Sequence, residues 1–205
     1  MDRRTTIRWV LAASAALPLL RHRDAGAQPA PATRGYGTDP NLSVNYHPGG
    51  LWPLTMTPPQ RHLARILSDI IIPADDRSPS ASAAGVVDFI DEWVSAPYAD
   101  FQRDRGIVLR GFAWLDSESR RRFGKVFIEL ESTGQIGICD DMCDEARTAS
   151  TLREGARFFA LYRDLTAGGF YSSPVGRKDL NYIGNVPMAS FDGPPSALLK
   201  SLGLA

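Results

Sequence analysis

The sequence predicts an all-α fold, an irregular bundle of about six helices with a long non-regular N-terminal arm and a non-regular C-terminal tail. Apolar side chains recur at the helical spacing i, i+3, i+4, i+7 through most of residues 57–166, and no alternating run typical of a strand exceeds a few residues. The chain has 205 residues, 43% of them hydrophobic, which suffices for one core without disulfide support. We therefore expect one helical domain over residues 57–205, preceded by an arm over residues 28–56.

The first two helices are bounded by prolines. The first is expected from Thr57 to just before Pro73, because Pro58 suits the first helical position and Pro73 cannot continue the pattern. Its apolar face consists of Leu63, Ile66, Leu67, Ile70 and Ile71. The second helix ends before Pro97, and its apolar face consists of Val86, Phe89, Ile90, Trp93 and Val94.

The next helices are less sharply bounded. A third is expected over about residues 98–115, and Asp116-Ser117 is interpreted as the cap of a fourth. The apolar face of the fourth consists of Phe123, Val126, Phe127 and Leu130. A sixth helix covers residues 152–166, with Gly168-Gly169 as its C-terminal stop.

A weaker fifth helical segment contains both cysteines of the chain. The spacing is interpreted as placing Ile136, Cys139 and Cys143 on one helical face. Three interpretations of the cysteines stay open: two small core residues, a disulfide with each other or with a partner chain, or a redox-active pair. A bond within one helix would strain disulfide geometry, and the usual Cys-x-x-Cys redox spacing is absent.

Both ends of the domain combine non-regular sequence with large apolar side chains. The arm contains Leu51 and Trp52, and the tail, expected from about residue 170, contains Phe170, Tyr171, Tyr182 and Phe191. Within the tail, a short helix is expected only over residues 196–202. Such segments either pack on their own domain or contact another protein. We predict that these six residues form a partner interface.

Residues 1–27 are predicted to be an export signal. Basic residues precede an apolar segment over residues 9–20, which is too short to span a bilayer, and Ala25 and Ala27 form a small-x-small cleavage site. The pair Arg3-Arg4 favours a twin-arginine signal over a general secretory signal, and hence a periplasmic protein. Removing residues 1–27 takes away five arginines and two aspartates, which leaves 18 basic and 21 acidic residues.

No catalytic, cofactor-binding or metal site is predicted. Beyond the signal, the only histidines are His47 and His62, neither in a metal-binding or nucleophile-activating spacing. The acidic residues at 140, 141, 144 and 145 lack the glycine and distal glutamate of a calcium loop. The whole chain balances 23 basic against 23 acidic residues, without the basic excess of a nucleic-acid-binding protein.

Seven short segments follow one another along the chain: Leu-Thr-Met-Thr-Pro-Pro-Gln (54–60), Ile-Ile-Pro-Ala-Asp-Asp (71–76), Gly-Val-Val-Asp-Phe-Ile-Asp-Glu-Trp (85–93), Arg-Arg-Phe-Gly (121–124), Arg-Asp-Leu-Thr-Ala-Gly-Gly-Phe-Tyr (163–171), Tyr-Ile-Gly-Asn-Val-Pro (182–187) and Phe-Asp-Gly-Pro-Pro (191–195). Together they resemble the gluconate 2-dehydrogenase subunit 3 family. The resemblance covers about residues 52–203 and the export signal.

The resemblance implies a small subunit, without a cofactor of its own, of a periplasmic sugar dehydrogenase. The expected partner is a large FAD-binding subunit of the glucose–methanol–choline type, in some complexes joined by a cytochrome c whose haem takes the electrons. The flavin subunit is expected to have no export signal of its own. The small subunit is then expected to escort it across the membrane. The segment Gly-Tyr-Gly-Thr-Asp-Pro (35–40) favours the branch that oxidises glycosides at the 3-position over the branch that acts on sugar acids.

Two other functions are weighed against this one. A stand-alone enzyme would have to use Asp75, Asp76 or His62, and the sequence offers no third group to orient a base. A periplasmic binding module or chaperone for apolar clients would be a stable monomer with a pocket and no fixed partner. The accessory subunit is preferred because it accounts for the aromatic side chains at both ends.

Overall fold

The computed structural model describes residues 46–144 and 149–182, residues 184, 187 and 189–190, and residues 193–204. The chain divides into two compact units, Met1–Thr38 and Asp39–Ala205, and all described residues belong to the second. The predictions for Arg3, Arg4, Ala25, Ala27 and Phe191 lie outside the described residues. The described part contains seven α-helices, two short 3₁₀ helices and no strand, which confirms the all-α prediction.

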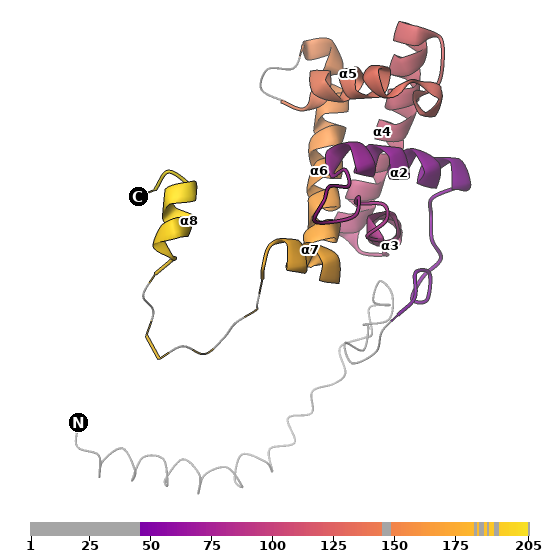
Figure 1. Cartoon of the computed structure of the whole chain (residues 1–205). Coiled ribbons are helices and arrows are strands. Elements are labelled where there is room, and N and C mark those ends of the chain that lie inside the picture. Colours follow the sequence, from indigo (N-terminus) through magenta and orange to yellow (C-terminus); the bar gives the residue numbers. More distant parts are fainter. Residues whose placement is uncertain are drawn as a thin grey trace, which may run out of the picture. The chain divides into compact units, whose positions relative to one another are not determined.

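One helix, α6 (Arg153–Ser172), contacts most of the others. Its neighbours are α2 (Pro58–Ile71), α3 (Val86–Ser95), α4 (Ala99–Phe123), α5 (Ser132–Met142) and α7 (Pro174–Asp179). Figure 1 shows α4 and α6 side by side, with α5 across one end of the pair and α3 and α7 at the other end. The remaining elements are 3₁₀ helices η1 (Phe127–Glu129) and η2 (Ser150–Leu152), and α8 (Ser196–Ser201).

Tyr162 of α6 lies in the centre of the core. Its ring packs against those of Phe112 and Phe158, with centroids 5.7 Å away in both cases. Its hydroxyl donates to the carbonyl oxygen of Ala64 at 2.9 Å and lies 3.0 Å from the Oγ of Ser68. Burial raises the pKa of the Tyr162 hydroxyl. The buried phenol is thus fully hydrogen-bonded and ties α6 to α2.

The first two predicted helices are confirmed as α2 and α3. At the start of α2, the backbone N–H of Thr57 donates to the Oε1 of Gln60 at 2.9 Å, one half of a capping box. Pro58 occupies the first helical position. Gly85, with φ of +87°, begins α3 in a left-handed conformation that favours glycine.

The predicted break at Asp116-Ser117 is wrong, because α4 is one helix of 25 residues that passes through both positions and ends at Phe123. The Oγ of Ser117 donates to the carbonyl oxygen of Ala113 at 2.9 Å, a bond made inside a helix rather than at its start. Asp116 accepts the backbone N–H of Phe127 at 3.1 Å and so holds the η1 turn against α4. The helix ends at Gly124, which has φ of +73°.

The predicted face of α5 is also wrong. Its buried residues are Gln135, Ile138, Cys139 and Met142, whereas Ile136 is 45% exposed and Cys143 follows the helix as an exposed residue. The segment is short and its apolar residues are few, so the periodicity did not fix which side faces the core.

The predicted stop at Gly168-Gly169 and the non-regular tail from about residue 170 are corrected as well. Helix α6 continues to Ser172, so Gly169 does not end it. The glycine instead permits close packing, since an added Cβ there would lie 2.6 Å from the ring of Phe89. After Ser173, which caps α7 by accepting the N–H of Gly176 at 3.1 Å, the tail forms α7, a helix that was not predicted. The short final helix expected over residues 196–202 is confirmed as α8.

Candidate partner-binding surface

The end of the arm is fixed to α3 by Asp91, whose side chain is completely buried. One carboxylate oxygen, Oδ1, accepts the backbone N–H groups of Thr55 at 3.2 Å and Met56 at 3.0 Å. The hydroxyl of Ser95 donates to the Oγ1 of Thr55 at 3.0 Å. Of the two arrangements expected for the arm, this part of it packs on its own domain.

The other carboxylate oxygen of Asp91 pairs with a cation. The guanidinium of Arg61 donates to Oδ2 at 2.6 Å and also bonds to Asp88, one turn earlier on α3. The bond to Asp88, followed by that to Asp91, raises the pKa of Arg61 against the opposing effect of burial. A buried carboxylate is tolerated here because both of its oxygens accept hydrogen bonds and one of them pairs with a cation.

The preceding residues of the arm lie on the end of α3. Glu92 accepts the backbone N–H of Gly49 through its carboxylate, and its carbonyl oxygen accepts the indole N–H of Trp52 at 3.2 Å. Trp52 and Leu51 are both half-buried, whereas Tyr46 is 42% exposed. The arm therefore presents part of each ring to the surface while its backbone and indole nitrogen are held.

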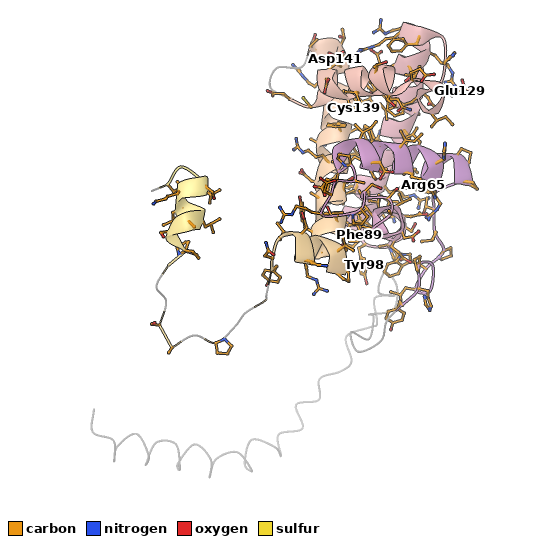
Figure 2. The ribbon with its side chains drawn as sticks, viewed as in Figure 1. Arg65, Phe89, Tyr98, Glu129, Cys139 and Asp141 are labelled. Carbon is orange, nitrogen blue, oxygen red and sulfur yellow. The ribbon has the colours of Figure 1, made fainter. Side chains whose placement is uncertain are left out.

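From Trp52, aromatic rings form a continuous series across α3 and the start of α4. Trp52 contacts Tyr98 edge-on at 6.1 Å between centroids, Tyr98 contacts Phe101 at 5.6 Å, and Phe101 contacts Trp93 at 4.1 Å. Trp93 contacts Phe89 at 5.9 Å. We call these five residues the aromatic row; all of them are half-buried. Figure 2 shows Phe89 and Tyr98 at the α3–α7 end, with Glu129 and Cys139 at the opposite end.

The aromatic row reaches the C-terminal end of α6. The ring of Phe89 lies directly against Gly169, whose next neighbours along the chain are Phe170 and Tyr171. Two predicted interface segments, one in the arm and one near residue 170, are thus brought to one end of the bundle.

The predicted interface residues that the structure describes differ in how exposed they are. Leu51 and Trp52 are half-buried, Tyr171 is 38% exposed and Tyr182 is 59% exposed. Phe170 is corrected: it is 1% exposed and fills the core behind Tyr171, so its ring is not accessible to a partner. Four residues of this surface, Phe89, Trp93, Tyr98 and Phe101, were not predicted to belong to an interface; four aromatic residues within residues 89–101 were a signal for it.

Of the groups considered for chemistry, Asp75 has a structural role. Asp75 accepts the backbone N–H groups of Arg77 and Ser78, both at 2.8 Å, and these bonds lower the pKa of its carboxyl. His47 and His62 are exposed. Within the ranges that the structure describes, no three His, Cys, Asp or Glu side chains come together as a metal site requires. Among the described helices, none is long and apolar enough to cross a bilayer.

The two cysteines do not share a face, and both are free thiols. Cys139 is buried in the core, and burial, followed by the charge of Asp140, raises its pKa to about 12. Cys143 is exposed, and its thiol donates to the carbonyl oxygen of Asp140 at 3.1 Å. The interpretation as a core residue holds for Cys139, and a disulfide of Cys143 with a partner chain stays a prediction.

Comparisons with known proteins bear on this surface. No curated protein and no solved structure shows significant similarity to the chain. A model of one protein family, described as gluconate 2-dehydrogenase subunit 3, matches residues 58–193, which is more than half of the chain and includes helices α2 to α7. The chain therefore belongs to the gluconate 2-dehydrogenase subunit 3 family, the small accessory subunits of a dehydrogenase that has further subunits.

Proposed function

We propose that this chain is a non-catalytic accessory subunit that binds a large FAD-dependent dehydrogenase subunit and accompanies it to the periplasm. The single observation that supports the proposal is the aromatic row in a chain of this family. Five half-buried rings form one continuous surface, and the exposed Tyr171 follows two residues after Gly169, against which Phe89 lies. Aromatic side chains are enriched in the buried centre of protein interfaces, which is where this surface would be placed by a partner.

The polar edges of the row fit an interface better than a ligand pocket. The indole N–H of Trp93 donates to Asp104 at 2.9 Å, and that of Trp52 donates to a carbonyl oxygen, so both nitrogens are already satisfied within this chain. A partner could therefore cover both indole rings without leaving their N–H donors unpaired. Because the rings are already fixed by contacts with one another, little side-chain entropy is lost on binding.

Export supplies the reason for a separate small subunit. The twin-arginine pair Arg3-Arg4 is of the kind that directs folded proteins, so one signal can carry a second polypeptide bound to it. In this proposal the partner is of the glucose–methanol–choline type and holds the FAD, a third subunit with haem c takes the electrons, and the partner oxidises a sugar or glycoside.

The test is co-expression of the full chain, tagged at its C-terminus, with a large flavin subunit sought among the neighbouring genes. We expect the tag to retain a protein with a flavin absorbance spectrum, and the periplasmic fraction to contain both chains. Replacing Arg3 and Arg4 by lysine is expected to leave both in the cytoplasm. Tyr171→Ala and Tyr182→Ala change exposed rings, and each is expected to weaken the complex by about tenfold or more.

Phe123→Ala is the matched control. Phe123 is 50% exposed but lies at the other end of α4, 22 residues or about 33 Å from Phe101. It is expected to leave binding unchanged. A flavin subunit that reaches the periplasm without this chain, or that does not bind it, would contradict the proposal and favour a stand-alone binding module.

A further inference from the structure

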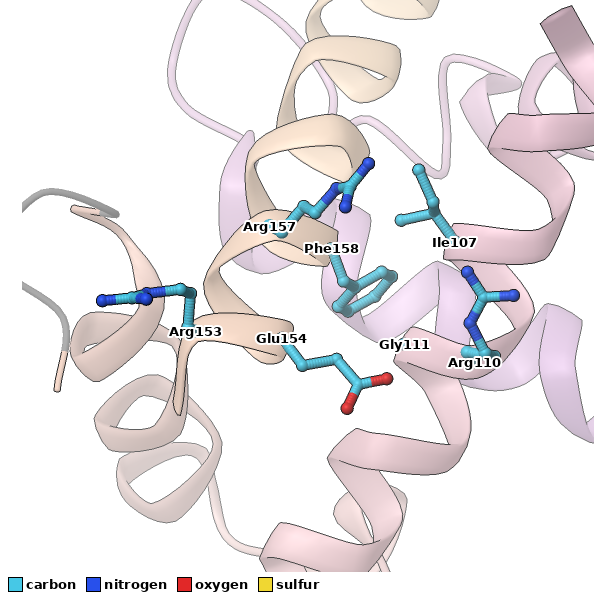
Figure 3. Close-up of a pocket in the computed structure, with 7 residues that line it drawn as sticks. All are labelled: Ile107, Arg110, Gly111, Arg153, Glu154, Arg157 and Phe158. Carbon is cyan, nitrogen blue, oxygen red and sulfur yellow. The ribbon is translucent and has the colours of Figure 1, made fainter. Parts of the chain in front are cut away.

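A groove of about 420 Å³ runs between α4 and α6. Ile107, Arg110 and Gly111 line it from α4, and Arg153, Glu154, Arg157 and Phe158 line it from α6. Figure 3 shows Arg110 and Arg157 on opposite walls, with the ring of Phe158 between them and α2 and α3 behind the pair. The groove therefore opens on the face of the α4–α6 pair that α2 and α3 leave uncovered.

The bottom of the groove is apolar, and α4 and α6 approach each other closely there. Gly111 is buried, and an added Cβ would lie 2.0 Å from the ring of Phe158, so only glycine lets this ring lie against α4. Phe158 itself is 1% exposed. Charges at the rim of such a groove face a wall of low dielectric, which strengthens their attraction for an opposite charge.

The rim carries more positive than negative charge. Arg110, Arg153 and Arg157 are exposed and make no ion pair among the described residues, and Glu154 supplies the single negative charge. This differs from the arginines at positions 61, 103, 121, 122 and 163, each of which pairs with a carboxylate of this chain. The groove also adjoins the first turn of α6, where no side chain caps the helix and the backbone dipole adds positive potential.

We infer that this groove docks an acidic segment of the dehydrogenase subunit, with carboxylates between Arg110 and Arg157 and an apolar side chain over Ile107. The inference rests on the proposed function, which it deepens by naming a second contact. The groove lies near the aromatic row along α4, because Ile107 is one turn from Asp104, the acceptor of the Trp93 indole N–H. Charge complementarity selects an acidic partner segment over a basic one.

The test measures affinity between the purified full chain and the flavin subunit at 50 and 300 mM salt. The variant Arg110→Glu with Arg157→Glu reverses both charges, and we expect it to weaken binding by about a hundredfold at 50 mM salt. The neutral variant Arg110→Gln with Arg157→Gln is expected to weaken it by about tenfold and to reduce the loss of affinity with salt. Both changes are on exposed side chains, and circular dichroism before the assay verifies the fold.

Arg65→Glu is the matched control, since Arg65 is an exposed arginine of α2 that makes no ion pair among the described residues. We expect its affinity to equal that of the unchanged chain. Groove variants that bind as tightly as the unchanged chain, or an Arg65→Glu chain that is weakened as much as they are, would overturn the inference while the complex, and so the proposed function, stands. Failure of the unchanged chain to bind would instead overturn the proposed function.

Discussion

Gly111 of α4 lies directly against the ring of Phe158 of α6, with no room for a single added carbon. A Cβ at position 111 would be 2.0 Å from both Cγ and Cδ2 of Phe158, and that ring is buried and already packed edge-on against Phe112. The distance between the two longest helices is therefore set by the absence of a side chain at one position.

Gly111→Ala is accordingly expected to destabilise the domain. Overlap of this depth in a closed core costs about 3 kcal/mol, at the upper end for overpacking, and the better helix propensity of alanine offsets about 1 kcal/mol of it. The net loss of about 2 kcal/mol is measured by urea unfolding. Gly137→Ala on α5 is the control, because no atom lies within 4 Å of an added Cβ there, and it is expected to stabilise by about 0.5–1 kcal/mol. Equal effects at the two positions would contradict the packing argument.

The ion pairs of Glu118 are expected to make the stability of the domain depend on pH. Its nearly buried carboxylate accepts from Arg121 at 2.7 Å and from Arg122 at 2.6 Å, and Arg122 continues to Asp141 at 2.5 Å. These bonds, that to Arg121 first, lower the pKa of Glu118 to about 2 from an ordinary value of 4.5. Because the folded-state pKa is the lower one, the stabilisation is fully present above about pH 4.5 and is lost as the pH falls toward 2.

Glu118→Gln is expected to lower stability at pH 7 by about 1–3 kcal/mol and to flatten the decline between pH 4.5 and 2. The measurement is the midpoint of thermal unfolding across that range. Glu129→Gln, at an exposed carboxylate, is the control and is expected to give a curve parallel to that of the unchanged chain. An unaltered acid response in Glu118→Gln would show that other carboxylates carry it.

The parts of the fold that depend on residues close together in the sequence could be predicted from the sequence. The start of α2 at Pro58 and the stop before Pro73 follow from the prolines themselves, and the apolar faces of α2 and α3 follow from spacing. The end of α4 could not be predicted in this way. Aspartate is a residue type that often caps helices. Asp116, however, accepts the backbone N–H of Phe127 across a turn, a contact that exists only in the folded chain.

The candidate site shows the same division. The sequence identified aromatic residues at both ends of the domain, but it could not tell Phe170, which fills the core, from Tyr171, which reaches the surface, because adjacent residues of a helix differ by 100° in direction. The aromatic row joins residues from the arm, α3 and α4, and their half-burial depends on where these three elements meet. Periodicity alone assigned Phe89 and Trp93 to an interior face.

Asp91 links the stability of the domain to the position of the arm, and so gives the sharpest test of how the surface is built. Asp91→Asn keeps the shape, but its amide group must meet either the guanidinium of Arg61 or the N–H groups of Thr55 and Met56, which are all donors. We expect a loss of about 1–3 kcal/mol in the free energy of unfolding, and about 3–5 kcal/mol for Asp91→Ala, which leaves Arg61 with one of its two partners. Amide hydrogen exchange of Thr55 and Met56 is expected to become faster.

Asp88→Asn serves as the control, since Asp88 bonds to the same arginine from the same helix but its side chain is 47% exposed and it makes no bond to the described residues of the arm. It is expected to cost about 0–1 kcal/mol and to leave exchange at Thr55 and Met56 unchanged. Binding of the flavin subunit separates two roles. If Asp91 positions Trp52 for the partner, Asp91→Asn weakens the complex under conditions where the variant is fully folded, because the arm must then be ordered at the expense of binding free energy. Unchanged affinity with faster exchange would place the partner contact on α3, α4 and the end of α6 and leave the arm outside it.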